Sequence, residues 1–282
     1  MLLEGKKILI MGIRNKWSIA FGIAQSVYEN GGKLIFTYRG ESNKEKIEEL
    51  VSEFKGSKIY ALDDASDDEQ VKSVFENIKE EKENKTMVKV TVNVEGMMCG
   101  HCEAHVNGKI DGIVHSIAHA NTEDLHNDFI YTSKNGYLHA METSAYSLLL
   151  ATRTAKEIDM LNEHSSIVTL TYHGSMKVIN GYNVMGAAKA ALEANVRYLA
   201  ENLGKEEMRV NAISAGPIKT LSAKGIKDFS SMLTIVEEKA PLHKNVTTKQ
   251  VGNVATFLLS DMSDAITGQV IYADNGYNIM GA

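Results

Sequence analysis

Short apolar segments rich in β-branched residues alternate along this chain with longer amphipathic segments, and this alternation restricts its fold more than any other feature. The segments with strand character are Lys7–Met11, Lys33–Tyr38, Lys58–Leu62, Gly112–Ser116, Ile167–Thr171, Arg209–Ile213 and Gln269–Ala273. The helical segments between them are Ser18–Asn30, Lys44–Phe54, Asp68–Glu81, Tyr137–Leu161, Tyr182–Leu203 and Lys249–Leu259. Apolar strands separated by helices form a parallel sheet with helices on both faces. The sequence therefore predicts an α/β, doubly wound parallel sheet of the Rossmann type, in one domain that spans residues 1–282.

The composition is that of an ordinary globular protein and argues against several functions. Hydrophobic residues make up 44% and charged residues 23% of the 282 residues, which is typical of soluble domains. The net charge of −6 argues against nucleic-acid binding, which requires a basic face. No apolar run reaches membrane-spanning length, and the start of the chain lacks a signal-peptide pattern. We therefore expect a cytoplasmic protein with no membrane partner.

The turn after the first predicted strand has the features of a phosphate-binding site. Gly12 stands at the turn, and Ser18 is placed to cap the helix that follows. Backbone N–H groups at such a helix end can hold a pyrophosphate. The spacing is not that of the G-x-G-x-x-G fingerprint, so a glycine turn with a serine cap and no ligand is the alternative interpretation.

Tyr182 and Lys189 form the most specific chemical pattern in the chain. They are seven residues apart in a segment with helical periodicity, so both project from one face of a helix. A phenol near an ammonium can donate a proton, because the positive charge favours the phenolate. A surface tyrosine beside an unrelated lysine is the alternative, and the surrounding motifs must decide between the two.

Residues 82–108 interrupt the alternation. Val88, Val90, Val92 and Val94 alternate with polar residues, which indicates an extra strand. The only two cysteines, Cys99 and Cys102, follow it in a Cys-x-x-Cys arrangement with His101 and His105 nearby. In a reducing compartment this spacing indicates metal binding or redox activity rather than a structural disulfide.

Several motifs together resemble the short-chain dehydrogenase/reductase superfamily, and within it the bacterial enoyl-acyl-carrier-protein reductases. The six-residue gap in Tyr182-Asn-Val-Met-Gly-Ala-Ala-Lys189 is that of the enoyl reductases, whereas other members space the pair four apart. The other similar motifs are Ser18-Ile-Ala, Phe36-Thr-Tyr-Arg-Gly, His115-Ser-Ile-Ala-His-Ala, the run from Arg209 to Ala223, and Ile266-Thr-Gly-Gln. The resemblance covers nearly all of residues 1–81 and 109–282.

The resemblance implies NADH- or NADPH-dependent reduction of a trans-2-enoyl thioester in fatty acid biosynthesis. It assigns Tyr182 as the donor to the thioester carbonyl, Lys189 to the nicotinamide ribose, and Tyr172 to a position near the acyl chain, with Ala120 also close to the substrate. It assigns to cofactor binding Gly12, Ser18, Ile19, Asp63, Asp64, Ser116, Ile117, Ala118, Lys189, Ile218, Lys219, Thr220, Leu221 and Ser222. An acyl carrier protein as partner and a homotetramer are also implied. A carbonyl reductase of the same superfamily is a weaker alternative, because the four-apart spacing is absent.

The choice between NADH and NADPH stays open. Arg39 follows the second strand, where NAD-specific proteins often carry an acidic residue. Its guanidinium could pair with a 2′-phosphate, but Gly40 lacks the second positive charge that would make NADPH clear.

The cysteine segment resembles the opening strand and metal loop of heavy-metal-associated domains, and contains only the first part of such a domain. Cys99 and Cys102 could hold Cu(I), whereas Zn²⁺ would need two more ligands such as His101 and His105. This gives a competing hypothesis, a metal-binding protein carried on a reductase scaffold. An insert with two free thiols that contributes nothing to catalysis is the third.

Overall fold

A single parallel sheet of seven strands forms the centre of the protein. The computed structural model describes residues 1–80, 109–220 and 229–281. In spatial order the sheet is β3-β2-β1-β4-β5-β6-β7, and every neighbouring pair is parallel. The strands are β1 (Lys7–Met11), β2 (Lys33–Tyr38), β3 (Lys58–Ala61), β4 (Ile110–His115), β5 (Leu161–Thr171), β6 (Arg209–Ala215) and β7 (Val270–Ala273). The predicted doubly wound fold is confirmed.

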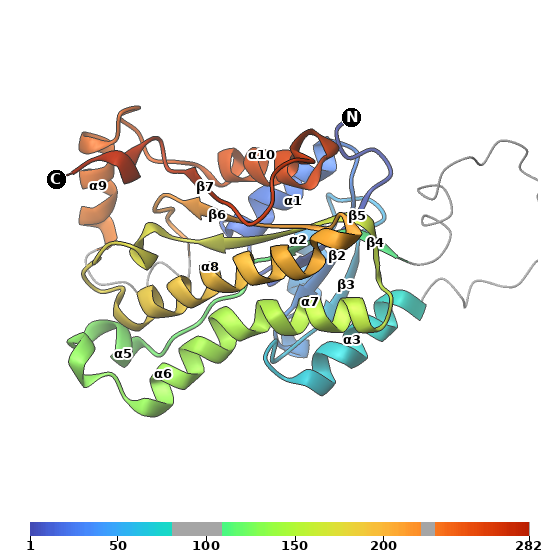
Figure 1. Cartoon of the computed structure of the whole chain (residues 1–282), viewed down its shortest axis with the longest axis horizontal. Helices are drawn as coiled ribbons and strands as arrows, with labels where there is room; N and C mark the ends of the chain where they lie inside the picture. The colour runs from blue at the N-terminus through green and yellow to red at the C-terminus, as the bar shows by residue number, and fades with distance from the viewer. Residues whose placement is uncertain (81–108, 221–228, 282) are drawn as a thin grey trace, which may run out of the picture.

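Helices cover both faces of this sheet (Figure 1). One layer packs α3 (Asp68–Glu80), α7 (Ser147–Glu157) and α8 (Asn183–Leu203) against the sheet. The opposite layer contains α1 (Ile19–Glu29), α2 (Lys44–Val51) and α10 (Thr248–Leu259). β1 shows how one strand serves both layers, because Leu9 and Met11 belong to the first core and Ile8 and Ile10 to the second. Successive side chains of a strand point to opposite faces, so a strand buried on both faces is apolar at every position.

Three further helices lie at or near the carboxyl end of the sheet, where the strands lead into loops (Figure 1). They are α5 (Thr122–His126), α6 (Lys134–Met141) and α9 (Phe229–Lys239). Neither α5 nor α9 was expected from the sequence, because their apolar residues pack on loops and neighbouring helices rather than on the sheet.

The expected helix over Tyr137–Leu161 is wrong at both ends. It starts earlier, as α6, passes through a π-helical turn over Glu142–Tyr146 and ends as α7 at Glu157. Asp159 then adopts a left-handed conformation with φ of 52°, and Leu161 is already the first residue of β5. The apolar side chain of Leu161 fits a helical period, but hydrogen bonding to β4 places it in the sheet.

The other expected boundaries agree with the structure to within a few residues, except that β5 starts six residues earlier than predicted. The polar residues of its first half hid that part of the strand. Residues 82–108, with the predicted strand and cysteine loop, fall within 81–108, which lie outside the described residues. In the described ranges, no helix is both long and apolar enough to cross a membrane.

Candidate active site

A cavity of about 400 Å³ opens at the carboxyl ends of the strands. Strand order reverses between β1 and β4, and the two loops that leave them separate there, as expected for ligand sites in such sheets. The cavity volume is within the range of small-molecule sites, about 300–1,000 Å³. Of the residues predicted to contact cofactor or substrate, those that line it are Gly12, Ser18, Ile19, Ser116, Ile117, Ala118, Ala120, Tyr172, Tyr182, Lys189, Ile218 and Thr220.

The β1–α1 turn forms one wall of the cavity. Gly12 has φ of +87°, and a Cβ atom there would lie 2.7 Å from the carbonyl oxygen of Ser116. Only glycine therefore lets the ends of β1 and β4 approach so closely. Ser18 caps α1 as predicted, and its side chain accepts a hydrogen bond from the N–H of Phe21 at 3.2 Å. The positive end of α1 thus faces the cavity, in a form suited to a diphosphate.

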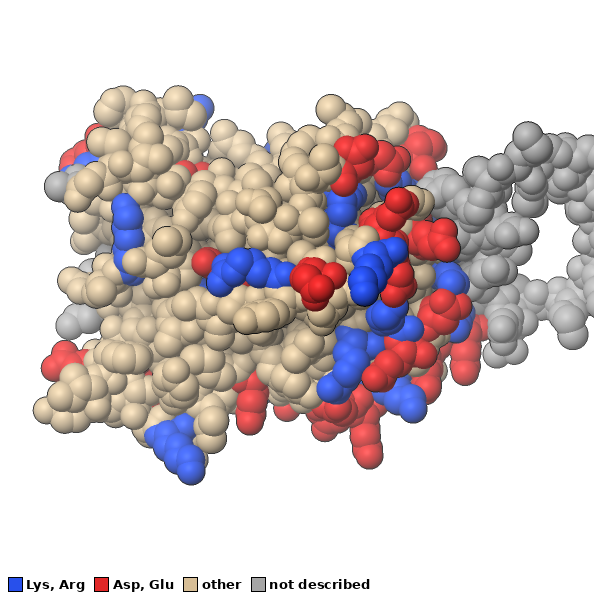
Figure 2. Space-filling view, in the orientation of Figure 1, with Lys and Arg blue, Asp and Glu red and all other residues tan. Residues whose placement is uncertain are grey.

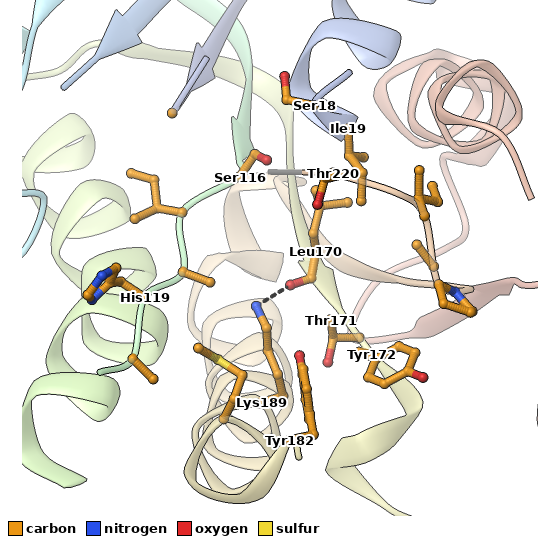
Figure 3. Close-up of a pocket in the computed structure, with 18 of the residues that line it drawn as sticks. Ser18, Ile19, Ser116, His119, Leu170, Thr171, Tyr172, Tyr182, Lys189 and Thr220 are labelled. Atoms are coloured by element: carbon orange, nitrogen blue, oxygen red, sulfur yellow. Dashed lines mark hydrogen bonds between the residues drawn. The ribbon is translucent and has the colours of Figure 1, made fainter. Parts of the chain in front are cut away.

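Tyr182, Lys189 and Tyr172 form the opposite wall (Figure 3). Tyr182 immediately precedes α8, and Lys189 lies two turns further along the same helix. The ring of Tyr172, which follows β5, meets the ring of Tyr182 edge-on, with centroids 4.9 Å apart. The Lys189 ammonium donates a hydrogen bond to the carbonyl oxygen of Leu170 at 2.7 Å. The two elements that carry these side chains are thereby joined inside the cavity.

Burial sets the charge state of this wall. It raises the pKa of Tyr182 and of Tyr172 above the ordinary value, so both phenols are neutral hydrogen-bond donors near pH 7. It lowers the pKa of Lys189 to about 8, because desolvation outweighs the opposing effect of the nearby Glu193 charge. The site therefore combines neutral donors with an ammonium that titrates close to neutral pH.

His115 is buried at the end of β4, next to Ser116 of the cavity lining, and was not predicted as a functional residue. Its Nδ1 is 3.0 Å from Oγ1 of Thr169, and its Nε2 is 2.9 Å from Oγ of Ser147. The Ser147 hydroxyl donates to the Thr143 carbonyl, so it accepts from Nε2 and leaves Nδ1 as the acceptor. Burial, with the Lys189 charge, lowers the pKa of His115 to about 3. We infer that His115, as a neutral ring, ties the end of β4 to β5 and α7.

Four predicted cofactor residues lie outside the cavity wall. Asp63 accepts a hydrogen bond from the backbone N–H of Gly40 at 2.6 Å. Asp64 accepts from the backbone and hydroxyl of Ser66, which lowers its pKa. Arg39 and Lys219 are exposed. Leu221, Ser222, Cys99 and Cys102, with His101 and His105, lie outside the described residues.

The cavity also has an apolar end that the sequence analysis missed. It is formed by Leu125, Met185 and Met232, which come from α5, α8 and α9. Met232 also accepts a hydrogen bond from the Tyr172 hydroxyl, at 3.2 Å. The helical period of Met185 was visible in the sequence, but nothing local indicated that these three would meet. Such an end could receive an acyl chain.

Comparisons of the sequence with a family model and with curated proteins point to the same family. The family model described as enoyl-(acyl carrier protein) reductase matches residues 12–101 and 87–278. The enoyl-[acyl-carrier-protein] reductase [NADH] of Bacillus cereus is 44% identical over 281 residues, 99% of each chain. The [NADPH] enzyme of Staphylococcus aureus strain MRSA252 is 44% identical over 278 residues, 98% of each chain.

Two solved structures are similar to this chain in fold as well as in sequence. A crystal structure of the Bacillus cereus enoyl-acyl carrier protein reductase with NADP⁺ and indole naphthyridinone has a TM-score of 0.88 at 44% identity. The match covers 100% of this chain and 99% of the Bacillus cereus chain. The NADH-named enzyme of Aquifex aeolicus has a TM-score of 0.87 at 40% identity, and covers 100% of both chains.

Gly12→Ala tests the close approach of β1 to β4. The methyl group would meet the Ser116 carbonyl, so we expect unfolding free energy to fall by about 1–3 kcal/mol more than in the control. Gly56→Ala is the matched control, because Gly56 also has a positive φ, of +80°, but has nothing within 4 Å of its would-be Cβ. Urea denaturation measures both. Equal losses would show that the strained backbone, rather than the contact, requires glycine at position 12.

Proposed function

Because the chain belongs to the enoyl-acyl-carrier-protein reductase family, an oxidoreductase family of fatty acid biosynthesis, we propose how its residues divide the work of reducing a trans-2-enoyl thioester. The observation that carries the proposal is that Tyr182, Lys189 and Tyr172 share one buried wall of the cavity. A reduced nicotinamide cofactor, when bound, supplies the hydride to the β-carbon of the substrate. The glycine turn and the α1 N-terminus fit its diphosphate, because Gly12 and the helix cap Ser18 line the cavity at the positive end of α1.

Tyr182 donates a hydrogen bond to the thioester carbonyl, where negative charge develops as the enolate forms. Its phenol is neutral at pH 7 because burial raises its pKa. A donor in a water-poor cavity stabilises such a charge far better than one in bulk water. Tyr172 and the apolar end hold the acyl chain, and Ala120 lies beside the substrate.

Lys189 holds the nicotinamide ribose hydroxyls with its ammonium, which the Leu170 carbonyl already orients at 2.7 Å. The remaining cofactor contacts are those assigned by family resemblance, namely Gly12, Ser18, Ile19, Asp63, Asp64, Ser116, Ile117, Ala118, Ile218, Lys219, Thr220, Leu221 and Ser222. The reductant is NADH or NADPH, and the choice between them stays open. Arg39 would pair with the 2′-phosphate of NADPH, and the names of the relatives divide between the two cofactors.

The substrate arrives on an acyl carrier protein, the carrier that the relatives' names contain. Lys219 is exposed on the segment after β6 and would attract an acidic partner. Two further lysines that follow in the sequence, Lys224 and Lys227, lie outside the described residues. A cytoplasmic location and the division into a reductase domain with an insert at 82–108 stay predictions.

The two competing hypotheses have less support. A carbonyl reductase would space the tyrosine and lysine four apart, whereas Tyr182 and Lys189 are seven positions apart. Metal binding at Cys99 and Cys102 stays a prediction. In the part of the chain that the structure describes, no group of three or more His, Cys, Asp or Glu could hold a metal.

Tyr182→Phe tests the proposed donor. Loss of one donor at a developing oxyanion typically lowers kcat by about 10²–10³-fold, and we expect this with a crotonyl thioester and NADH or NADPH. Tyr198→Phe, at an exposed position on the same helix, is the control. The assay is run with and without a chelator, since a metal-dependent activity would favour the competing hypothesis. Full activity in Tyr182→Phe would remove the assignment.

The pH dependence of cofactor capture tests Lys189. A lysine whose pKa is lowered to about 8 is charged below that pH and neutral above it. We therefore expect kcat/KM for the reduced cofactor to be constant at lower pH and to fall as pH rises through about 8, because this parameter reports the free enzyme. In Lys189→Ala this limb should disappear with a large rise in KM. Unchanged cofactor affinity in that variant would refute the role.

We propose that the protein forms a homotetramer. Exposed apolar side chains on the outer faces of α6, α7 and α8 support this proposal. Leu138, Leu149 and Tyr198 are 45%, 37% and 75% exposed. Charged side chains gather at the end of the molecule near α3, and much of the remaining visible face carries few of them (Figure 2). Helices in this superfamily pack across two-fold axes through such faces.

Light scattering on purified protein should give four times the chain mass at assay concentration. Tyr198→Asp should shift the mass toward smaller species, because a carboxylate would be buried in the contact. Lys55→Glu, at an exposed position near α2 on the opposite layer, should leave it unchanged. A monomer mass for the parent protein would contradict the proposal.

A further inference from the structure

Glu193 is a buried carboxylate on the helix that carries Tyr182 and Lys189. It is 7% exposed, as buried as Lys189 at 6%. At about 100° per residue, position 193 falls within about 40° of both other positions around α8, so the three share one stripe. A buried charge is unfavourable unless it is paired or hydrogen-bonded. Its partners therefore indicate what it does.

Two hydroxyl groups donate to one oxygen of this carboxylate. Oγ1 of Thr171 and Oγ of Ser175 each lie 2.6 Å from Oε1 of Glu193. Thr171 is the last residue of β5 and lines the cavity, and Ser175 ends the 3-10 turn that follows. Tyr172 lies between these two residues in the chain. The carboxylate thus holds the segment of Tyr172 from both sides, and charge-assisted hydrogen bonds of this length are strong.

The same carboxylate acts on Lys189 through its charge. Glu193 raises the pKa of Lys189 and so opposes the effect of burial, which leaves the pKa at about 8. The other groups that face this pair are His115 from β4, Tyr182 at the start of α8, and Tyr272 from β7. His115 is neutral above about pH 3, and burial keeps the phenols of Tyr182 and Tyr272 neutral. Glu193 is therefore the negative charge that compensates Lys189 among these groups.

We propose that Glu193 is a positioning residue whose carboxylate holds the end of β5 against α8 and supplies the counter-charge for the buried Lys189 ammonium. The inference rests on the proposed role of Lys189 in binding the cofactor. It adds two separable functions to one side chain. The hydrogen bonds fix the distance between Tyr172 and Tyr182, and the charge fixes the pH range in which Lys189 is an ammonium.

Glu193→Gln separates the two functions, because its amide oxygen can still accept both hydroxyl hydrogen bonds while the charge is lost. We expect kcat near pH 6.5 within about three-fold of the parent, since the geometry is kept. An opposite charge nearby favours the ammonium, and this variant lacks that charge. The fall of kcat/KM for the reduced cofactor at high pH (the basic limb of the pH profile) should therefore begin about one pH unit lower. At pH 8 this appears as a several-fold rise in KM for the cofactor, with a smaller change in kcat.

Glu193→Ala removes both functions. The loss of charge-assisted hydrogen bonds should lower kcat by about 10–100-fold, and lowering the pH should not restore it. Ser175→Ala removes one hydrogen bond and keeps the charge, so it should lower kcat by a smaller factor and leave the basic limb in place. Glu201→Gln is the charge control, because Glu201 is exposed on the same helix and its neutralisation should move neither parameter.

The outcomes distinguish this inference from the proposed function. If the parent shows the basic limb and Lys189→Ala abolishes it, but Glu193→Gln leaves it in place, the counter-charge role is wrong while the enzyme assignment stands. A Glu193→Ala variant with parental kcat would overturn the positioning role. Thermal unfolding identifies any misfolded variant. If Glu193→Ala does not fold, Glu193→Gln and Ser175→Ala still test the two functions separately. Absence of cofactor binding in the parent protein would instead refute the proposed function itself.

Discussion

The parallel pairing of β1 with β4 is the constraint on which the cavity depends. These strands are adjacent in the sheet but are separated in sequence by β2, β3 and their helices. Their carboxyl ends lead into loops that turn to opposite faces, and the space between the loops is the cavity. Gly12 allows this arrangement, because any side chain there would meet the Ser116 carbonyl 2.7 Å away. The α1 N-terminus, capped by Ser18, then lies at the cavity wall.

Burial sets the protonation states of Tyr182 and Lys189 in the cavity wall that they form with Tyr172. An exposed tyrosine and lysine would behave as isolated surface groups, but here desolvation raises the pKa of Tyr182 and lowers that of Lys189. The two shifts move the pKa values of the phenol and the ammonium apart, so Tyr182 stays a neutral donor over the range in which Lys189 titrates. Burial of a charged group is unfavourable without a partner, which explains the backbone carbonyl at Lys189 and the hydroxyl groups at Glu193.

Two sets of hydrogen bonds, one around His115 and one around Glu193, hold the elements that carry the wall. β4 supplies His115, β5 supplies Thr169 and Thr171, and the helices supply Ser147 and Glu193. Each contact joins a strand to a helix or to a neighbouring strand, so the catalytic side chains are held by the sheet and by the helix layer together. The apolar end is instead shaped by the packing of side chains from α5, α8 and α9.

The sequence by itself determined the kinds of element, their order and the spacing of Tyr182 and Lys189, because hydrophobic period and helical geometry are local properties. It failed where local signals conflicted with long-range pairing, as at Leu161, which starts β5 and pairs with Ile110 of β4 rather than continuing a helix. Only the tertiary structure decided that Met232 would close the cavity and that Glu193 would hold the segment of Tyr172. These contacts, and the pKa values that burial imposes, depend on which surfaces exclude water from one another, and that is a property of the packed chain rather than of any segment of it.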